Sequence, residues 1–255
     1  MKNPMAYIEY EIDPGPTSGF YWYPKIAHLP YVPRTILVRA NESSLFAAID
    51  GQDPVAMPMY YDAMEAVKAA ADQIGYPAFI RTDLASAKHD GQESYLASDK
   101  SRVANVMLTT IESNVLKGLG GFIQGFMVRE YLHLRAPFIA FRGHPVAREF
   151  RLFFKHERVV CHHPYWPEAA IHFGFGQSEP HGWKESLAAI SELESSEEEH
   201  LYSMAHQAGA LCKDAWPDWS IDFAQDEAGK WWLIDMARAH QSWHPEDCPH
   251  VDKRE

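Results

Sequence analysis

The sequence predicts an α+β protein, in one large domain or two small lobes, rather than a regularly alternating α/β sheet. Along the 255 residues, the patterns run helix and strand, helix and strand, a β-rich centre, a long helical stretch and a closing hairpin. This order lacks the strand–helix alternation of a doubly wound parallel sheet. With 46% hydrophobic and 23% charged residues, the chain has enough apolar surface for a full core.

The N-terminal part of the chain is poor in regular patterns. Residues 1–59 are rich in proline, tyrosine and turn residues and contain one strong strand pattern, Thr35 to Ala40. We expect a reduced N-terminal region, because these residues alone hold too little apolar surface for a stable domain. Tyr61 to Ile74 then shows helical spacing, followed by the helix stop Gly75 and the short strand PAFIR.

The remaining elements follow from periodicity and turn signals. A second helix is expected over Lys100 to Leu116, and then the strands FIQGFMVREYLHL and FIAFRG. REFRLFFKHERVVCHHPYW predicts a hairpin that turns at His156-Glu157. Trp183 to Cys212 is expected to be helical, and WSIDFAQ and KWWLIDMA form two apolar strands joined by DEAG.

Charge and cysteine content exclude several classes of protein. The chain has 23 Lys and Arg against 35 Asp and Glu, a formal net charge of -12. Such a surface repels phosphate backbones and anionic membranes, so we expect neither nucleic acid nor membrane as partner. The sequence shows no apolar run near the ~18–20 residues that span a bilayer and no secretory signal. Three scattered cysteines suit a reducing compartment, and we expect a cytoplasmic protein.

The closing hairpin carries two acidic residues in apolar strands, Asp222 and Asp235. A carboxylate buried in such a strand is costly unless it meets a metal ion or a cation. Two strands joined by a short turn can place both side chains on one face, where they suit Mg²⁺. Pairing of either Asp with an arginine, or a position at the end of a strand, explains the pattern equally well.

Basic residues stand at two further strands. Lys88 follows a strand and a polar loop, and Arg81 ends that strand; both could meet a phosphate, although a surface position is the default for a lysine. In REFRLFF, alternation places Glu149 and Arg151 on one face and Arg148 on the other. An arginine in an apolar strand needs a buried anion, which is either a phosphate or an internal carboxylate.

In this order, the motifs GYPAFIRTDLASAKHD, FMVREYLHL, REFRLFF and WSIDFAQDEAGKWWLIDMA resemble the ATP-grasp fold over roughly residues 60 to 243. The resemblance is to a minimal branch that includes phage-encoded ATP-grasp domain proteins and the eukaryotic cell-division-cycle translation-factor assembly proteins. It implies two α+β lobes that sandwich ATP. The implied ATP-grasp domain covers 60–245, with an N-lobe over 60–127, a C-lobe over 128–245 and a tail over 246–255.

The resemblance also implies roles for individual residues. Lys88 and Arg151 would act on the ATP phosphates as catalytic residues, with help from Arg81. Asp222 and Asp235 would hold Mg²⁺. The hinge between the lobes would bind ATP through Val128, Arg129, Glu130, Tyr131 and Leu132, with the backbone around Glu130 and Tyr131 reading the adenine edge.

The function implied is a ligase that joins a carboxylate to an amine or similar nucleophile through an acylphosphate, releasing ADP and phosphate. Small-molecule or peptide substrates would bind at Arg129, Arg142 or Arg148. The family usually has an Asn two positions after its second acidic ligand, but here Ala237 stands there. This departure favours an alternative, an ATP-binding assembly factor with little turnover and a protein partner. KHDG also fits the K-x-D-G pattern of nucleotidyltransferases, in which Lys88 would carry AMP.

Histidines and cysteines near the C-terminus offer a separate possibility. His240, His244, Cys248 and His250 have the residue types of a zinc site, although a polar tail explains them as well. His162 and His163 cannot both face one site in an extended strand. Cys161 follows two valines and precedes the two histidines. Its thiol is a conceivable nucleophile, but a buried inert thiol is the simpler interpretation.

Overall fold

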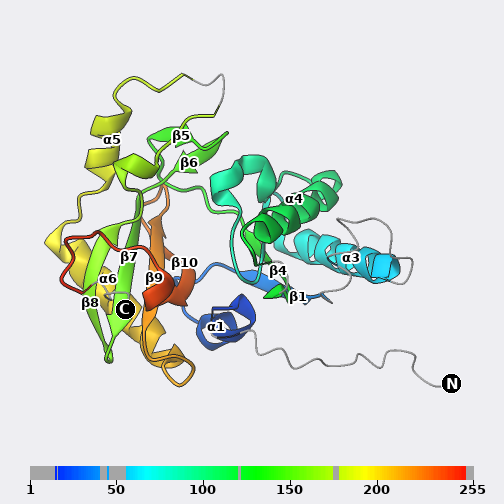
Figure 1. Ribbon diagram of the computed structural model, residues 1–255, viewed down its shortest axis with the longest axis horizontal. Helices are drawn as coiled ribbons and strands as arrows, with labels where there is room; N and C mark the ends of the chain where they lie inside the picture. Colours follow the sequence, from blue (N-terminus) through cyan, green and yellow to red (C-terminus); the bar gives the residue numbers. More distant parts are fainter. Residues whose placement is uncertain are drawn as a thin grey trace.

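Two antiparallel sheets, each covered by helices on one face, stand side by side in the computed structural model (Figure 1). The structure describes residues 15, 17–40, 45, 56–119, 122–174 and 178–250. The segregated helices and antiparallel sheets confirm the predicted α+β class. In the described residues, no helix has the length and apolar character needed to cross a membrane.

The N-terminal lobe has the strand order β1-β4-β2-β3. Its strands are β1 (Thr35–Arg39), β2 (Ala78–Thr82), β3 (Leu96–Ala97) and β4 (Gly125–Glu130). Two long helices pack on one face, α3 (Ala56–Ile74) and α4 (Val103–Leu116), with three short 3₁₀ turns, η1 (Lys88–Asp90), η2 (Gln92–Ser94) and η3 (Lys100–Arg102). Ile80 and Val128 point into this helix-covered core. Their neighbours Arg81 and Arg129 therefore point to the opposite face, toward the other lobe.

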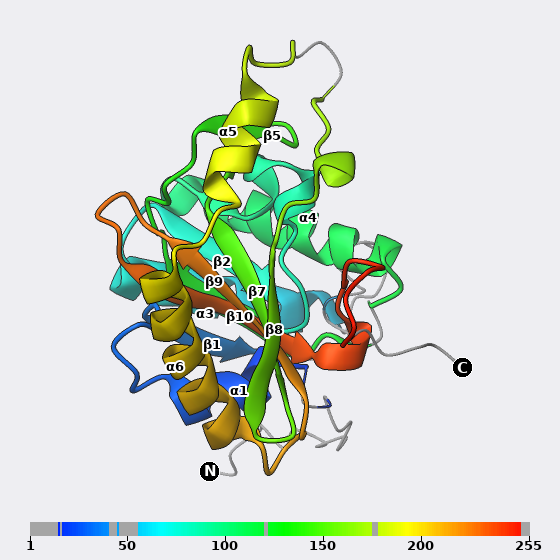
Figure 2. The ribbon, with the colours of Figure 1, turned by 90° about the vertical axis from the view of Figure 1, so that its left-hand side faces the viewer.

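The C-terminal lobe has the strand order β10-β9-β7-β8. Its strands are β7 (Glu149–Lys155), β8 (Arg158–Pro164), β9 (Trp219–Gln225) and β10 (Trp231–Arg238). Helix α6 (Ser195–Cys212) lies along one face of this sheet (Figure 2). The small pair β5 (Phe138–Ala140) and β6 (His144–Val146), helix α5 (Trp183–Ile190) and the 3₁₀ turns η5 (Glu168–Ala170) and η6 (Ala239–Gln241) complete the lobe.

Strand alternation decides which side chains of the second sheet face the other lobe. In β7, Phe150, Leu152 and Phe154 belong to the core beneath α6. Glu149 and Arg151 consequently lie on the opposite face, as the sequence predicts. This face carries the polar residues of the C-terminal lobe.

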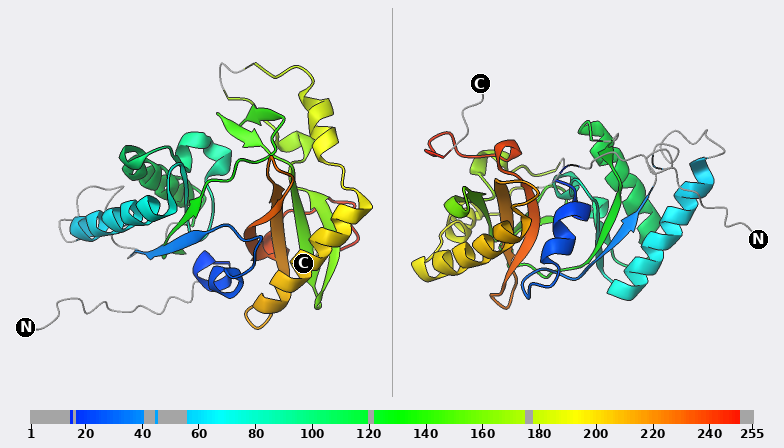
Figure 3. Two further views of the ribbon diagram at one scale, coloured as in Figure 1. Left: turned by 180° about the vertical axis from the view of Figure 1, so that it is seen from behind. Right: turned by 90° about the horizontal axis from the view of Figure 1, so that it is seen from below.

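Elements from the predicted N-terminal region join both lobes. Strand β1 pairs with β4 in the first sheet. Helix α1 (Gly19–Ile26) lies between the two sheets, where its Trp22 and Ile26 share the core beneath α6 (Figure 3). Much of the remainder of 1–59 lies outside the described residues. The domain limits 1–59, 60–245 and 246–255 stay a prediction.

Most predicted elements are present, but α1, β3 and β6 were not predicted, and three predicted elements differ in extent. The first long helix begins at Ala56 rather than Tyr61, and the strand predicted over FIQGFMVREYLHL covers only β4. The helical stretch from Trp183 is broken in two, because Glu194 and Glu197 form a capping box that starts α6. The β7–β8 hairpin turns at His156 and Glu157 as expected, both with positive φ.

Candidate functional site

A cleft between the two lobes collects most of the residues that the sequence singles out. Its volume is about 620 Å³, including the part that is open to solvent. One wall comes from β2, the end of β4, the loop into η1 and the segment that follows β4. The other wall comes from β6, β7 and β10. The lining residues are Phe79, Arg81, Ser86, Lys88, Tyr95, Arg129, Glu130, Tyr131, Leu132, Leu134, His144, Pro145, Glu149, Ile234 and Asp235.

The two aspartates of the closing hairpin lie side by side, as the sequence predicts. Asp235 of β10 is the register partner of Asp222 of β9, and Arg151 of β7 is the next partner along the same row. A β-bulge at Ile234 makes this possible. Leu233 points into the core under α6, so strict alternation would send Asp235 there too; one extra residue turns its carboxylate into the cleft.

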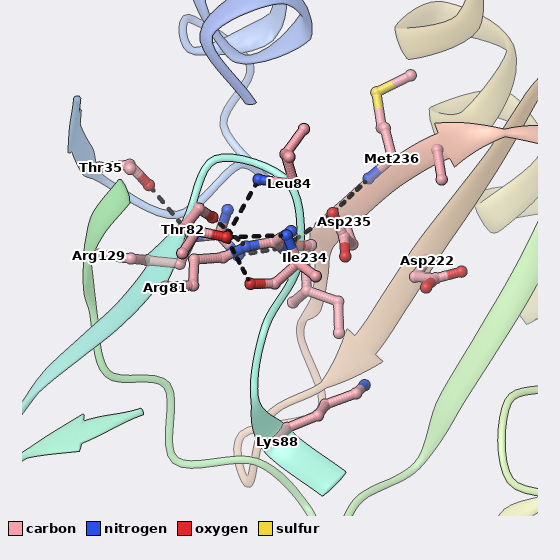
Figure 4. Close-up of polar contacts among 12 residues, drawn as sticks. Thr35, Arg81, Thr82, Leu84, Lys88, Arg129, Asp222, Ile234, Asp235 and Met236 are labelled. Carbon is pink, nitrogen blue, oxygen red and sulfur yellow. Dashed lines mark hydrogen bonds and ion pairs between the residues drawn. The ribbon is translucent and has the colours of Figure 1, made fainter. Parts of the chain in front are cut away.

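Each aspartate forms an ion pair with an arginine. Arg151 donates from Nε and Nη2 to the two carboxylate oxygens of Asp222, both at 2.8 Å. Asp222 raises the pKa of Arg151 against the opposing effect of burial. Across the cleft, Nη1 of Arg81 lies 2.9 Å from Oδ1 of Asp235 (Figure 4). Pairing with arginine, the alternative to metal binding, is thus the arrangement seen in this structure.

Lys88 is buried and paired with a carboxylate from the opposite lobe. Its Nζ donates to Oε2 of Glu149 at 2.8 Å and lies 3.8 Å from the centre of the Tyr165 ring. Burial by itself would lower the pKa of Lys88, but the Glu149 carboxylate outweighs it and raises that pKa. Burial raises the pKa of Glu149, against the effect of Lys88. The lysine is therefore held protonated, as a point charge.

Arg129 is a buried arginine whose hydrogen-bonding capacity is partly unused. Its Nη1 donates to the carbonyl of Ile234 at 2.6 Å and its Nε to Oγ1 of Thr35 at 3.2 Å. Among the described residues, its Nη2 has no hydrogen-bond partner. Burial, followed by the charge of Arg81, lowers the pKa of Arg129 to about 10. An anion in the cleft would satisfy this guanidinium.

The predicted hinge residues divide into two groups. Glu130, Tyr131 and Leu132 line the cleft, and so does Leu134, which the sequence analysis missed. The side chain of Val128 is fully buried in the N-terminal lobe, so it contributes only to the core. Leu132 lies outside any strand, and the described part of the chain shows no hydrogen bond to its backbone. Free backbone groups at this position could pair with a base edge.

Two arginines suggested for substrate binding lie elsewhere. Arg148 is on the α6 side of β7, where Nη1 and Nη2 meet the Glu197 carboxylate at 2.6 and 2.7 Å. This is the internal ion pair that the sequence analysis left open. Arg142 is exposed, has a positive φ and is absent from the cleft wall.

Three residues that surround the Lys88 ammonium were also not predicted as site residues. Glu149 binds Lys88, while Tyr165 and Trp166 place their ring centres 3.8 and 4.9 Å from the lysine Nζ. The alternation that places Glu149 on the face of Arg151 was the available signal. No local pattern links residue 88 to residues 149 or 165, because that contact depends on how the lobes close.

The donors present fit a magnesium nucleotide. Carboxylate oxygens from Asp222 and Asp235 are the hard ligands that Mg²⁺ takes, and nearby cations are the usual partners of phosphates. Arg129 is part of the cleft wall, and its buried Nη2, which has no hydrogen-bond partner among the described residues, is a further donor. Both aspartates would have to exchange an arginine for the metal ion, with the released arginines turning to phosphate oxygens.

Solved structures of other proteins are similar to this chain in fold. One is a C-terminally truncated form of Cdc123 from Schizosaccharomyces pombe, with a TM-score of 0.54 and 13% identity; the match covers 88% of this chain and 83% of that one. Another is Cdc123 from the same organism, with a TM-score of 0.52 and 14% identity; the match covers 87% of this chain and 82% of that one. The biotin carboxylase domain of Hydrogenobacter thermophilus 2-oxoglutarate carboxylase, solved with MgADP, matches with TM-score 0.42, 13% identity and coverage of 68% and 33%. No curated protein sequence matches significantly.

The sequence itself matches a family model over residues 72–254, which span both walls of the cleft. The matched family is described as ATP-grasp domain, R2K clade family 3. The match covers well over half of the chain, from the end of helix α3 through the closing hairpin and the segment after it. The chain belongs to the ATP-grasp superfamily, in R2K clade family 3.

Proposed function

We propose that this protein is an ATP-dependent ligase that joins a carboxylate to an amine or a similar nucleophile. A carboxylate oxygen of the substrate attacks the γ-phosphorus of ATP, and the bond between that phosphorus and the β,γ-bridging oxygen breaks to release ADP. The nucleophile then attacks the acyl carbon of the acylphosphate, and phosphate leaves. The observation that supports this most directly is the cleft itself, whose wall carries Arg81, Lys88, Arg129 and Asp235, with Asp222 beside Asp235 on the neighbouring strand.

This chemistry needs positioning and charge neutralisation rather than a side-chain nucleophile. Lys88 and Arg81 would contact the phosphates from the N-terminal lobe, and Arg151 from the C-terminal lobe. Glu130, Tyr131 and Leu132 would hold the adenine at the inner end of the cleft. Mg²⁺ held by Asp222 and Asp235 would neutralise charge on the transferred phosphoryl group.

Binding is tested by calorimetry with a non-hydrolysable ATP analogue, with and without Mg²⁺. Wild type should bind in a Mg²⁺-dependent manner, and Lys88→Ala should lose that binding. Lys184→Ala is a matched control, because Lys184 is an exposed lysine that pairs with Glu168 outside the cleft. Asp222→Asn and Asp235→Asn should fold and lose the Mg²⁺-dependent part of the affinity. Absence of binding to wild type would refute the proposal.

Turnover is tested without knowing the acceptor. Hydroxylamine traps acylphosphates as hydroxamates, so mixtures of amino acids or dicarboxylates can be screened for hydroxamate and ADP together. Formation of both in equal amounts, lost in Lys88→Ala, supports the ligase. ADP release that does not depend on any carboxylate would contradict it.

A second candidate is an ATP-binding assembly factor with little turnover. The observation in its favour is Ala237, which stands where the family usually has an Asn and whose register partner is Ser220. Such a factor would bind the magnesium nucleotide in the same cleft but give no hydroxamate with any carboxylate. A lysyl-AMP intermediate is disfavoured, because Glu149 keeps Lys88 protonated and a protonated amine is a poor nucleophile.

A further inference from the structure

A second cluster of metal-binding residue types lies outside the nucleotide cleft. Cys161, His163, His244 and Cys248 each offer one ligand atom, and these four atoms all lie within 4.8 Å of one another. Cys161 and His163 belong to β8, the edge strand of the second sheet. His244 and Cys248 come from the segment after η6, which passes beside this edge (Figure 2).

Strand geometry aims the two β8 residues at the segment. Cys161 and His163 are two positions apart, so they share one face of the strand. His162 between them points the other way and lies 3.1 Å from the hydroxyl of Tyr202 in α6. The prediction that His162 and His163 cannot share a site is thus confirmed, and His163 is the one whose ring lies 5.2 Å from that of His244.

The C-terminal segment is held in place by contacts around the cluster. The ring of His244 stacks on Phe153, with 3.5 Å between their centres. The Cys248 backbone N–H donates to the carbonyl of Pro245, closing a turn that buries the thiol. Lys155 Nζ donates to the carbonyl of His250 at 3.2 Å. The segment is therefore a closed loop that presents His244 and Cys248 inward.

The chemistry of the cluster selects the metal. Two thiols and two imidazoles form a sulfur and nitrogen donor set without a carboxylate, which suits Zn²⁺ and disfavours Mg²⁺. Tetrahedral zinc with bonds of about 2.0–2.3 Å holds its ligand atoms about 3.3–3.8 Å apart, so atoms within 4.8 Å of one another need to draw together by about 1.5 Å at most. Nε2 of His163 is buried and has no hydrogen-bond partner among the described residues, so a metal ion would satisfy it.

We propose that Cys161, His163, His244 and Cys248 bind one structural zinc ion that fastens the C-terminal segment to the edge of β8. Four protein ligands leave no open position, as in zinc sites that stabilise a fold rather than catalyse a reaction. Through His163, the register partner of Arg151, the site would hold the strand next to the row that carries Asp222. The sequence-based zinc group is thereby corrected: His240 packs against Trp216, and His250 offers its carbonyl to Lys155.

The test is the metal content of the full chain, purified under reducing conditions without chelator. Wild type should carry one zinc per chain by elemental analysis. After removal of zinc, Co²⁺ should give the visible bands of a tetrahedral site and a thiolate-to-cobalt charge-transfer band. Cys248→Ser and His163→Ala should lose both signals. Cys212→Ser is the matched control, because Cys212 is a buried thiol in α6 away from the cluster and its loss should change neither.

Stability supplies an independent readout. A chelator should lower the melting temperature of wild type and Cys212→Ser by the same amount, and should not change that of Cys248→Ser. Failure of wild type to bind zinc or cobalt while folded would overturn the proposal, and so would full zinc content in Cys248→Ser. A Cys161–Cys248 disulfide in protein kept under reducing conditions would also overturn it. These outcomes do not depend on nucleotide binding, so they are separate from the test of the proposed ligase.

Discussion

The buried pair between Lys88 and Glu149 gives the sharpest prediction for the cleft. The perturbation is a cycle of three variants, Lys88→Met, Glu149→Gln and the double variant, each of which keeps the approximate side-chain volume. The side chains of Lys88 and Glu149 are 10% and 1% exposed, so either one left alone is a buried charge without its partner. Removing one member of such a pair costs about 3–5 kcal/mol of folding free energy.

The structure makes the two single variants unequal. In Glu149→Gln, the lysine keeps the faces of Tyr165 and Trp166, and cation–π contacts of this kind are worth about 2 kcal/mol when desolvated. We therefore expect a loss of about 3 kcal/mol. In Lys88→Met, the Glu149 carboxylate loses its ion-pair partner and keeps only the more distant charge of Arg151. The loss should be about 4 kcal/mol, limited by uptake of a proton. The double variant removes both charges and should lie within about 1 kcal/mol of wild type.

The assay is urea unfolding at pH 7.5 without nucleotide, followed by tryptophan fluorescence and circular dichroism. These losses correspond to a coupling free energy of about 6 kcal/mol, far above the ~0.5 kcal/mol at which distant sites count as independent. Additive losses in the double variant would refute it. Glu149→Gln should also bind the non-hydrolysable ATP analogue at least as tightly as wild type, because Glu149 competes with phosphate for Lys88.

Three further predictions concern packing, pH and the second ion pair. Gly209→Ala should cost about 1–3 kcal/mol of unfolding free energy in a urea titration, because an added Cβ would lie 2.5 Å from the Phe154 ring. Burial lowers the pKa of His144 well below 6.5, so the folded state resists protonation and its stability is lost as pH falls through the unfolded value. Between pH 7.5 and 5.5 this loss should reach about 1.4 kcal/mol, and His144→Gln should remove it. Arg148→Met should lower the unfolding free energy by about 3 kcal/mol through loss of the Glu197 pair, with unchanged affinity for the nucleotide analogue.

Each of the three has a matched control on the surface. Ser203→Ala in α6, His28→Gln and Arg142→Met change exposed residues and should leave stability within about 0.5 kcal/mol of wild type. The packing argument fails if Gly209→Ala is as mild as Ser203→Ala. The pH argument fails if His144→Gln retains the slope of wild type. Weakened nucleotide binding in Arg148→Met would contradict the placement of Arg148 outside the nucleotide site.

Local sequence patterns were enough to place the acidic hairpin and its facing strand. Alternation in β7 correctly put Glu149 and Arg151 on one face, and the structure shows that Asp222 of β9 lies beside Arg151 on that face, because both strands bury their other face under α6. The hairpin turn explained why Asp222 and Asp235 become neighbours. What the pattern could not supply is the bulge at Ile234, because an extra residue in a strand leaves no mark in a short apolar run.

Contacts between the lobes were beyond the reach of local patterns. Arg81 meets Asp235 and Lys88 meets Glu149 only because the two sheets face one another. The sequence analysis predicted one strand and no helix in residues 1–59, whereas α1 forms there and its Trp22 lies in the C-terminal core. Local patterns also could not group Cys161 with Cys248, because these residues meet only when the segment after β10 folds back along β8.

The ion pairs of the cleft imply that metal and nucleotide bind together. Arg81, Lys88 and Arg151 are each matched by a carboxylate, so a triphosphate entering alone would compete for three occupied cations and face three anions. A metal ion entering alone would find Asp222 and Asp235 already paired. When both enter, the aspartates would turn to the metal ion and Arg81 and Arg151 to the phosphates, so neither these aspartates nor these arginines would be left unpaired. By linkage, Mg²⁺ must then raise the affinity for ATP by the same factor as ATP raises the affinity for Mg²⁺. We therefore expect the cleft to bind the magnesium nucleotide more tightly than either component alone.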